Sequence, residues 1–321
     1  MTFHVLVPDN VHQKALDLLK ANDVIRVSAP GLLARAALLE AVADAHALII
    51  RSGVKADAEL MEKAPKLKAI ARAGVGVDNV DLQAASARGV VVMNTPGGNT
   101  ISTAEHAFGL MIALSRHIAP GHQSLAEGRW ERKAFSGVEL KGKTLGIIGL
   151  GRIGQAIAAR AGAFEMDVIA RDPYLPAAVA EAIRVPLLDL DQVYARADYL
   201  TLHAMVTDET RGMINSESIA TMKDGVRIIN AARGALINSA DLAAALKSGK
   251  VAGAALDVYE TEPPPADHPL IGLPQVLHTP HLAASTADAQ VTVAVEAAQL
   301  VVDFLLEGVA ANVCNLDALE S

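Results

Sequence analysis

The first hundred residues alternate short apolar runs with longer amphipathic runs. In the longer runs, such as the one that begins at Val11, apolar residues recur at helical spacing. The short runs predict buried strands at Phe3–Val7, Val24–Val27, Ala47–Ile50, Leu67–Ala71 and Val90–Met93. Between them the pattern predicts helices at Val11–Leu19, Ala34–Ala43, Ala56–Lys63 and Asp81–Arg88. Such alternation predicts a parallel sheet with helices on both faces.

The segment Asn94–Thr100 is rich in residues that interrupt helices and strands, and it is the best candidate for a domain boundary. The stretch Ser102–Glu105 then has the spacing of a helix capping box, which predicts a helix that runs to about Ile118. We interpret Glu105 and His106 as ordinary residues of this helix. Residues 119–141 are polar, and we expect them to be irregular.

A second alternating series begins at Lys143. Its predicted strands are 145–148, Asp167–Arg171, Tyr199–Leu202, Val226–Asn230, Gly253–Leu256 and Val276–His278. Helices between them include Ser216–Met222 and Asp241–Leu246. Two such series predict an α/β protein with two doubly wound parallel sheets.

The apolar run Val291–Leu306 is long enough to be mistaken for a membrane helix. However, Glu296, Gln299 and Asp303 recur within it at spacings of three and four, which places them on one helical face. This is the pattern of an amphipathic helix in a soluble protein. We therefore expect a last long helix that packs on the fold and no membrane partner.

Three glycines, Gly149, Gly151 and Gly154, lie between a predicted strand and a predicted helix. In dinucleotide-binding folds the first glycine allows a tight turn, the second lets a pyrophosphate approach the backbone, and the third lets the helix pack on the strand. The start of the helix offers unpaired amides to the phosphates. About twenty residues on, Asp172 follows the next strand, where an acid binds ribose hydroxyls. The context indicates a dinucleotide site.

Composition narrows the class of protein. A length of 321 residues suggests two domains, and a hydrophobic content of 51% allows a large core. The net charge of −8 argues against general nucleic-acid binding. The lone cysteine, Cys314, excludes an intrachain disulfide and a Cys-rich metal site, so we expect no metal and a reducing compartment. The first residues do not form a secretory signal, which favours a cytoplasmic protein.

Three arginines follow predicted strands: Arg51, Arg72 and Arg233. In doubly wound sheets, ligands bind beyond the carboxyl ends of the strands. One such arginine would be a structural salt bridge, whereas three favour an anionic ligand, because a guanidinium matches carboxylate or phosphate with two hydrogen bonds. Gly74 and Gly76 follow Arg72 and could add backbone amides.

One histidine stands out among the ten. His281 follows the last predicted strand, where a histidine facing a nicotinamide could act as a general acid and base. A carboxylate beside it would raise its pKa and hold its tautomer. Asp257, Glu260 and Glu262 are all candidates for that carboxylate, and spacing does not choose between them. His278 lies inside a strand pattern, so we interpret it as a packed residue.

Together these stretches resemble the D-2-hydroxyacid dehydrogenase family over essentially the whole chain, and within it the D-3-phosphoglycerate dehydrogenase branch. In the first half the matching stretches are 72–81, 92–96, 130–133 and 142–154. In the second half they are 230–234, 254–260, 262–263 and 279–286. The stretches occur in the family's order.

The resemblance implies roles for named residues. His281 would be the acid and base, paired with Glu262, and Arg233 would bind the substrate carboxylate and keto oxygen. The implied NAD contacts are Gly149, Gly151, Arg152, Ile153, Gly154, Asp172, Ala231, Arg233, Asp257, His281 and Ala284. The implied substrate contacts are Arg51, Arg72, Gly74, Val75, Gly76, Arg132, Arg233 and His281. Arg51, Arg72 and Arg132 would hold a substrate phosphate, with Arg132 coming from the other subunit.

The resemblance also implies the organisation and the reaction. A flavodoxin-like substrate domain would comprise residues 1–98 and 285–321, and a Rossmann-type NAD-binding domain residues 99–284. The protein would be a homodimer or a dimer of dimers. It would oxidise D-3-phosphoglycerate to 3-phosphohydroxypyruvate in serine biosynthesis, with a small anionic 2-hydroxy or 2-oxo acid as its partner. Because the chain stops at Ser321, without the regulatory domains of longer relatives, we expect no serine feedback.

Some positions depart from the pattern and leave alternatives. Val75 and Ala204 replace threonines that some relatives place near the cofactor. Arg171 is basic where NADP-dependent relatives often carry a positive charge, but Asp172 would repel a 2′-phosphate, so we expect NAD. A glyoxylate, hydroxypyruvate or other 2-oxoacid reductase is the nearest alternative. An NAD-sensing binding protein on the same fold is a second one.

Overall fold

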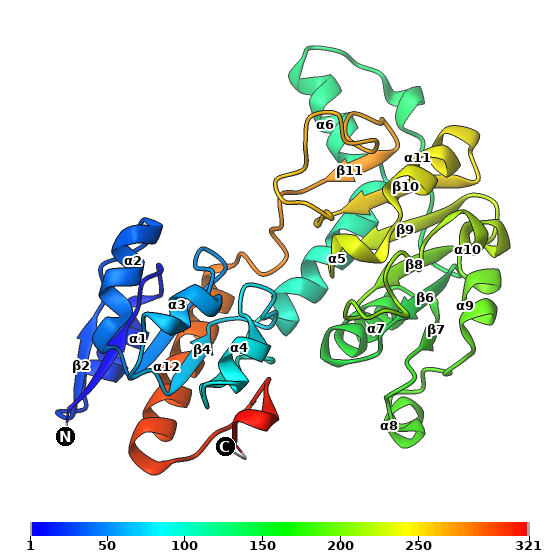
Figure 1. Ribbon diagram of the computed structural model, residues 1–321. Helices are drawn as coiled ribbons and strands as arrows, with labels where there is room; N and C mark the ends of the chain where they lie inside the picture. The colour runs from blue at the N-terminus through cyan, green and yellow to red at the C-terminus, as the bar shows by residue number, and fades with distance from the viewer. Residues whose placement is uncertain (1, 320–321) are drawn as a thin grey trace. The chain divides into compact units, whose positions relative to one another are not determined.

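The computed structural model describes residues 2–319, which divide into two compact units. One unit comprises residues 1–99 and 285–321, and the other comprises residues 100–284 (Figure 1). The expected boundary between them differs from this division by one residue. Each unit is an α/β fold with a parallel sheet, so the predicted fold class is confirmed.

The first unit is built on a five-stranded parallel sheet with the order β2-β1-β3-β4-β5. This order is that of flavodoxin-like folds. The strands are β1 (Phe3–Leu6), β2 (Ile25–Ser28), β3 (Ala47–Ile50), β4 (Ala69–Arg72) and β5 (Val91–Asn94). The helices are α1 (Gln13–Lys20), α2 (Arg35–Ala41), α3 (Ala58–Glu62), α4 (Leu82–Ser86) and α12 (Ala287–Glu307).

Two apolar cores lie on the two faces of this sheet. One core joins α1 and α12 to the strands, and the other lies under α2, α3 and α4. Within residues 2–319, α12 alone is long and apolar enough to span a membrane. Half of its apolar stretch is buried, and α12 packs against α1 and β4. It is therefore a core helix of this unit, as its amphipathic pattern predicted.

The second unit is built on a six-stranded parallel sheet with the order β11-β10-β9-β8-β6-β7. The chain crosses from one half of this sheet to the other between β7 and β8, which makes the edge at β6 and β8 the switch point where doubly wound folds bind ligands. The strands are β6 (Thr144–Ile148), β7 (Asp167–Arg171), β8 (Tyr199–Leu202), β9 (Val226–Asn230), β10 (Val251–Leu256) and β11 (Val276–His278).

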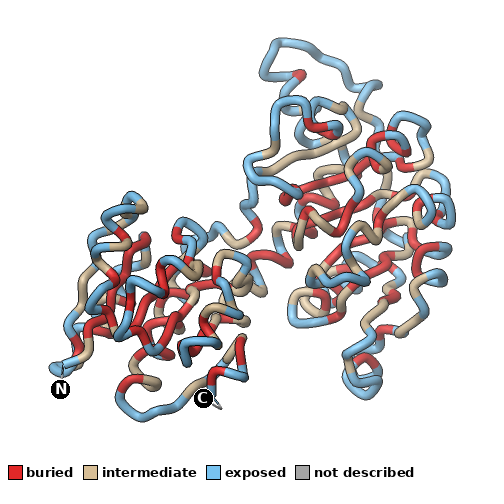
Figure 2. Tube along the Cα trace, in the orientation of Figure 1, coloured by how far each residue is buried: buried red, intermediate tan, exposed pale blue. Residues whose placement is uncertain are grey.

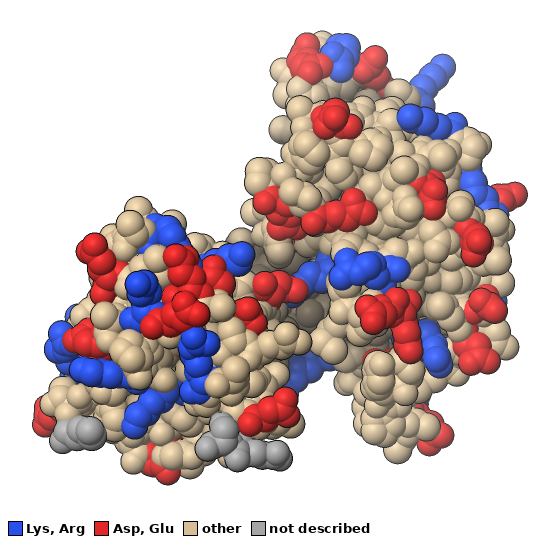
Figure 3. Space-filling model, in the orientation of Figure 1, with Lys and Arg blue, Asp and Glu red and all other residues tan. Residues whose placement is uncertain are grey.

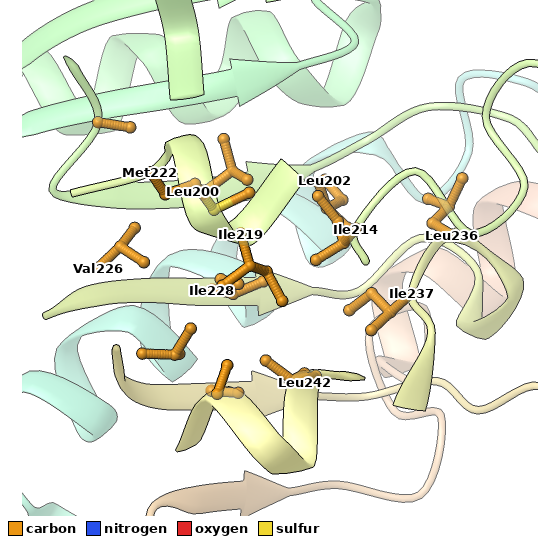
Figure 4. Packing of buried hydrophobic residues seen from close by; sticks show 14 of the residues in the cluster. Leu200, Leu202, Ile214, Ile219, Met222, Val226, Ile228, Leu236, Ile237 and Leu242 are labelled. Atoms are coloured by element: carbon orange, nitrogen blue, oxygen red, sulfur yellow. The ribbon is translucent and has the colours of Figure 1, made fainter. Parts of the chain in front are cut away.

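Helices cover both faces of this sheet and bury two apolar clusters. Figure 4 shows one cluster, in which Leu200, Leu202 and Ile228 of the strands meet Ile219 and Leu242 of the covering helices. In Figure 2 the inner strands of both units are mostly buried, whereas the edge strands β2, β7 and β11 are partly exposed. The helices are α5 (Thr100–Ser115), α6 (Ile118–Ala126), α7 (Arg152–Ala163), α8 (Ala177–Ala182), α9 (Leu190–Arg196), α10 (Ser216–Thr221) and α11 (Ser239–Ser248).

The prediction for residues 100–141 was wrong in two respects. Helix α5 begins at Thr100, so Ser102 is a buried residue of its first turn and not a cap. It ends at Ser115, and a separate helix, α6, begins after His117, whose backbone is left-handed with φ 52°. A short 3-10 helix, η2 (Arg132–Phe135), follows, so this segment is not irregular throughout.

Acidic and basic side chains are interspersed on the face shown in Figure 3. Ion pairs of the two units include Arg35 with Asp57 and Lys223 with Asp198.

Candidate active site

The predicted chemistry of the second unit lies along one edge of its sheet. All six strands are parallel, so the segments that follow them emerge at the same edge. The glycine turn follows β6, Arg233 follows β9, Asp257 follows β10 and His281 follows β11. The sheet therefore gathers residues that are up to 132 positions apart in the chain, from Gly149 to His281.

Two glycines of the turn are required by close backbone contacts. Gly149 has φ +93°, and a Cβ there would lie 2.5 Å from the carbonyl oxygen of His203. A Cβ on Gly154 would lie 2.2 Å from the carbonyl oxygen of Gly149. By contrast, no atom lies within 4 Å of a Cβ built on Gly151, which is exposed together with Arg152 at the start of α7. The turn therefore leaves open the face on which a pyrophosphate could meet the amides of α7.

Asp172 ties the end of β7 to the glycine turn. Its carboxylate accepts hydrogen bonds from the amides of Leu150 at 2.8 Å, Tyr174 at 2.9 Å and Leu175 at 3.1 Å. The residue remains partly exposed beside the turn. An acid in this place fits a dinucleotide whose ribose lies next to the open face.

The other predicted cofactor contacts lie along the same edge. Ile153 is half-buried in the first turn of α7, and Ala231 is buried directly after β9. Ala284, the last residue of the second unit, is partly exposed. The residues present therefore fit a bound NAD.

A partly buried histidine, His203, lies beneath the glycine turn at the end of β8. Its Nε2 and the Thr201 hydroxyl are 2.8 Å apart, and its buried Nδ1 has no hydrogen-bond partner. Burial lowers the pKa of His203 to about 3. The imidazole is therefore neutral near pH 7, and its backbone is packed against Gly149.

His281 is paired with Glu262, which settles the choice between the three acids. The His281 Nδ1 and the Glu262 Oε2 are 2.6 Å apart. The other carboxylate oxygen of Glu262 accepts the Tyr259 amide at 3.0 Å. A carboxylate can only accept, so the His281 Nδ1 carries the proton of this contact and the Nε2 is left for other chemistry. Both side chains are partly exposed, at 50% for His281 and 37% for Glu262.

Asp257, by contrast, is fully buried beneath the turn that carries His281. Its carboxylate accepts the amides of Leu282 and Ala283, each at 2.8 Å, and the Thr279 hydroxyl at 2.5 Å. The His106 Nε2 lies 3.2 Å away. Burial raises the pKa of Asp257, but these hydrogen bonds outweigh burial and hold it below its ordinary value. The side chain has no exposed area, and the NAD contact implied for Asp257 stays a prediction.

The interpretation of His106 as an ordinary helix residue was wrong. Its Nε2 lies 3.2 Å from Asp257 and 3.1 Å from the Thr279 hydroxyl, because α5 packs against β10 and β11. Glu105 is on the surface, where it pairs with Arg160 at 3.0 Å. Nothing in the local pattern distinguishes the two residues, since the partners of His106 are more than 150 positions away.

Arg233 follows β9 on a turn held by a buried asparagine. The Asn230 side chain accepts the Ala232 amide at 3.0 Å and donates to the Arg233 carbonyl at 2.8 Å. A Cβ on Gly234 would lie 1.9 Å from the carbonyl carbon of Tyr259. Gly234 therefore lets the Arg233 turn pack directly on the loop that carries the glutamate partner of His281.

His278 is a packed residue, as predicted. Its Nδ1 lies 2.7 Å from the Tyr259 hydroxyl, and the two rings are stacked. Burial, followed by the charge of His268, lowers the pKa of His278. Burial raises the pKa of Tyr259 to about 12. These rings line a cavity of about 380 Å³ whose rim includes His281.

In the first unit, Arg51 and Arg72 lie at the ends of adjacent strands. Residue 50 of β3 is opposite Arg72 of β4, and Arg51 follows directly. The Arg51 guanidinium donates to the Asn10 carbonyl at 3.1 Å. A Cβ on Gly74 would lie 1.4 Å from the Nη1 of Arg72, so only glycine lets this guanidinium fold over the backbone.

The remaining predicted substrate contacts fall into both units. Val75 and Gly76 are partly buried directly after Gly74. Arg132 belongs to the second unit, where it is the exposed first residue of η2. The structure therefore places Arg51 and Arg72 together in one unit and Arg132 in the other.

Comparison with known proteins identifies the family. Residues 108–283 match the D-isomer specific 2-hydroxyacid dehydrogenase, NAD binding domain. The chain is 47% identical to a D-3-phosphoglycerate dehydrogenase of Archaeoglobus fulgidus over 98% of its own length and 60% of that protein. It resembles the solved TT0316 protein from Thermus thermophilus, with a TM-score of 0.86 and 38% identity over 97% of this chain and 100% of that one. A glyoxylate reductase from Paecilomyes thermophila has a TM-score of 0.88 and 29% identity, with 98% of each chain covered.

The curated relatives are longer than this chain. The chain spans 60% and 59% of the length of the first two curated relatives. The family match covers more than half of the chain, and it includes the glycine turn, Arg233 and His281. The chain belongs to the D-isomer specific 2-hydroxyacid dehydrogenase family.

Proposed function

We propose that this protein is an NAD-dependent D-2-hydroxyacid dehydrogenase whose substrate pair is D-3-phosphoglycerate and 3-phosphohydroxypyruvate. One observation supports this proposal above the others. The paired His281 and Glu262 lie on the same sheet edge as a glycine turn that is open where a cofactor phosphate would approach. An acid and base beside a dinucleotide site is the arrangement that hydride transfer to or from a hydroxyacid needs.

The proton chemistry belongs to His281. A bound NAD would supply the acceptor for the hydride that leaves C2 of the hydroxyacid. The free Nε2 of neutral His281 takes the hydroxyl proton, and Glu262 at 2.6 Å from Nδ1 stabilises the imidazolium that results. In the reverse direction the protonated ring returns that proton to the keto oxygen.

Arg233 orients the substrate. Its turn packs on the loop of Glu262, which places Arg233 at the same sheet edge as the acid–base pair, with its Nη1 donating to the Ala232 carbonyl at 2.7 Å. A guanidinium binds a carboxylate with two parallel hydrogen bonds and thus fixes its plane. This contact would hold C2 toward the nicotinamide, which is a positioning effect.

The cofactor preference follows from Asp172. The glycine turn with Arg152 and Ile153 would hold the pyrophosphate, and Ala231 and Ala284 would border the nicotinamide half. The Asp172 carboxylate lies beside this turn and would repel a 2′-phosphate, despite the neighbouring Arg171. We therefore propose NAD in preference to NADP, with the second unit as the cofactor domain.

The substrate phosphate would be held by arginines. Arg51 and Arg72 at neighbouring strand ends form a cationic pair in the first unit, the proposed substrate domain. Arg132 would come from a second copy in a homodimer or a dimer of dimers. The relatives named D-3-phosphoglycerate dehydrogenase, at 46–47% identity, support a phosphorylated substrate. The proposed location is the cytoplasm.

A second candidate is a glyoxylate or hydroxypyruvate reductase. It is favoured by the likeness to a solved glyoxylate reductase over 98% of the chain. Such an enzyme would need the arginines for the carboxylate alone. An NAD-sensing protein would bind NADH but turn over no 2-oxoacid.

The test compares phosphorylated and unphosphorylated substrates in matched variants. We expect Arg51→Leu and Arg132→Leu each to lower kcat/KM for 3-phosphohydroxypyruvate by about tenfold or more, because each removes a charged hydrogen bond. Their effect on hydroxypyruvate should be small. Lys133→Leu is the control, since it makes the same change of charge next to Arg132.

Two outcomes would contradict the proposal. An equal loss of kcat/KM for both substrates would contradict the proposed phosphate pocket and favour the reductase. Binding of NADH by the wild-type chain without oxidation by any 2-oxoacid would favour the sensor.

A further inference from the structure

The backbone at His281 is in a conformation that residues other than glycine rarely adopt. Its φ is +56°, in the left-handed region. A histidine is held there only when its surroundings impose the conformation, and such residues are concentrated at functional sites. The structure must therefore contain a device that holds this turn.

Asp257 supplies most of that device. Its carbonyl oxygen accepts the His281 amide at 2.8 Å. Its two carboxylate oxygens accept the next two amides, of Leu282 and Ala283. One buried residue thus fixes three consecutive amides, and with them the direction in which the His281 side chain leaves the backbone.

A buried carboxylate holds such a turn only if its own position is fixed. The Thr279 hydroxyl donates its single proton to Asp257. Toward the His106 Nε2, 3.1 Å away, the same hydroxyl oxygen can then only accept. The carboxylate likewise only accepts, so the His106 Nε2 must carry a hydrogen that it shares between Asp257 and Thr279.

We propose that His106 is a positioning residue for the reaction: from α5, its Nε2–H fixes the Asp257 carboxylate and thereby the backbone turn that aims His281. We name His106, Asp257 and Thr279 the turn clamp. The catalytic consequence rests on the proposed function, whereas the structural consequence does not. His106 itself touches neither Glu262 nor His281 by any hydrogen bond within the described chain, so it acts through Asp257.

The burial pattern supports a dedicated contact. Asp257 has no exposed side-chain area, and His106 is 23% exposed. A buried carboxylate that loses a donor is costly, because water cannot replace the lost hydrogen bond. An apolar residue at this place on α5 would leave Asp257 short of one donor.

The test compares His106→Leu with His106→Gln. Leucine removes the donor, and glutamine places an amide N–H about where the Nε2 lies. Glu105→Gln is the control, since it changes a surface neighbour on the same helix. Three quantities are measured: backbone hydrogen exchange over residues 279–284, the NADH dissociation constant, and kcat with the 2-oxoacid that the wild type turns over fastest.

For His106→Leu we expect exchange at Leu282 and Ala283 to be about tenfold faster, because the amides lose a fixed acceptor. We expect kcat to fall on the order of 10- to 100-fold through misplacement of His281, with the NADH dissociation constant changed by less than about twofold. His106→Gln should restore most of both losses. Glu105→Gln should match the wild type.

The exchange measurement needs no turnover, so it separates the clamp from the proposed function. Unchanged exchange in folded His106→Leu would overturn the clamp. Accelerated exchange with unchanged kcat would overturn the positioning role while leaving the dehydrogenase assignment intact. If His106→Leu does not fold, failure of His106→Gln to keep wild-type exchange and kcat would overturn the proposal.

Discussion

Two turns at the same edge of the six-stranded sheet contain a residue with left-handed backbone, but they are held in different ways. In the turn after β6 this residue is Gly149, with φ +93°. In the turn after β11 it is His281, with φ +56°. Glycine adopts the conformation without strain, whereas the histidine turn is held by hydrogen bonds that its amides donate to Asp257.

The two turns therefore differ in how far they depend on residues distant in the chain. The glycine turn depends mainly on small residues within six positions, since any Cβ on Gly149 or Gly154 would clash with backbone, and Asp172 adds one hydrogen bond to it. The His281 turn must present a side chain, so glycine cannot serve, and Asp257, directly after β10, and His106 of α5 hold it instead. The proposed cofactor turn is thus formed mostly by local residues, whereas the turn proposed to carry the acid and base is held by residues far away in the chain.

The largest expected effect concerns the turn that carries His281. Replacing His281 with alanine should lower kcat by about 10³-fold, the usual scale for loss of a general acid and base. Glu262→Gln should have a smaller effect, because the ring remains but loses its charged partner. Steady-state NADH oxidation provides the measurement, and activity near that of the wild type would refute the role of His281.

The next effect concerns the glycine turn after β6. Gly154→Ala should destabilise the protein by about 3 kcal/mol, because its Cβ would overlap the Gly149 carbonyl. Gly151→Ala is the matched control: its Cβ meets no atom within 4 Å, so stability should hold while NADH binding weakens. Chemical denaturation and NADH titration provide the data. Equal destabilisation by the two changes would show that close packing does not explain these glycines.

A smaller effect comes from His203, beneath the glycine turn. Its pKa of about 3 lies below the ordinary 6.5, so its contribution to stability is fully present above pH 6.5 and is lost as pH falls. At pH 5 the loss should be about 2 kcal/mol. We expect His203→Gln to remove this part of the pH dependence.

Denaturation curves at pH 7 and pH 5 measure the His203 effect. His122→Gln serves as the control, because His122 is exposed. If wild type and His203→Gln lost the same free energy of unfolding between these pH values, His203 would not be the buried neutral group described.

The smallest effect tests whether the His281 turn depends on the helix that follows it. The Thr286 hydroxyl caps α12 by accepting the Ala289 amide at 3.1 Å. Thr286→Ala should cost about 1 kcal/mol of stability and leave kcat unchanged, and Thr286→Ser should preserve both. A fall in kcat comparable to that of His106→Leu would mean that α12, and not Asp257 alone, holds the His281 turn.

The same contrast explains how much the sequence could predict. The strands and the glycine turn were predicted because their signals are local: an apolar run, then glycines at fixed spacing. The pairing of His281 with Glu262 followed from the family resemblance, and spacing alone left three acids open. His106 was misinterpreted because its partners follow it by 151 and 173 residues. Helix α6 was missed because Gly121 and Pro120 suppress the helical pattern, although proline is tolerated in a first turn.

The central claim is that His281 acts as the acid when a phosphorylated 2-oxoacid is reduced by a cofactor held on the glycine turn. The most direct measurement is kcat/KM of the wild-type chain for 3-phosphohydroxypyruvate and for hydroxypyruvate, with NADH in both cases. The account predicts a preference of about tenfold or more for the phosphorylated substrate, since two or more arginines would bind its phosphate. A wide preference for hydroxypyruvate would contradict it.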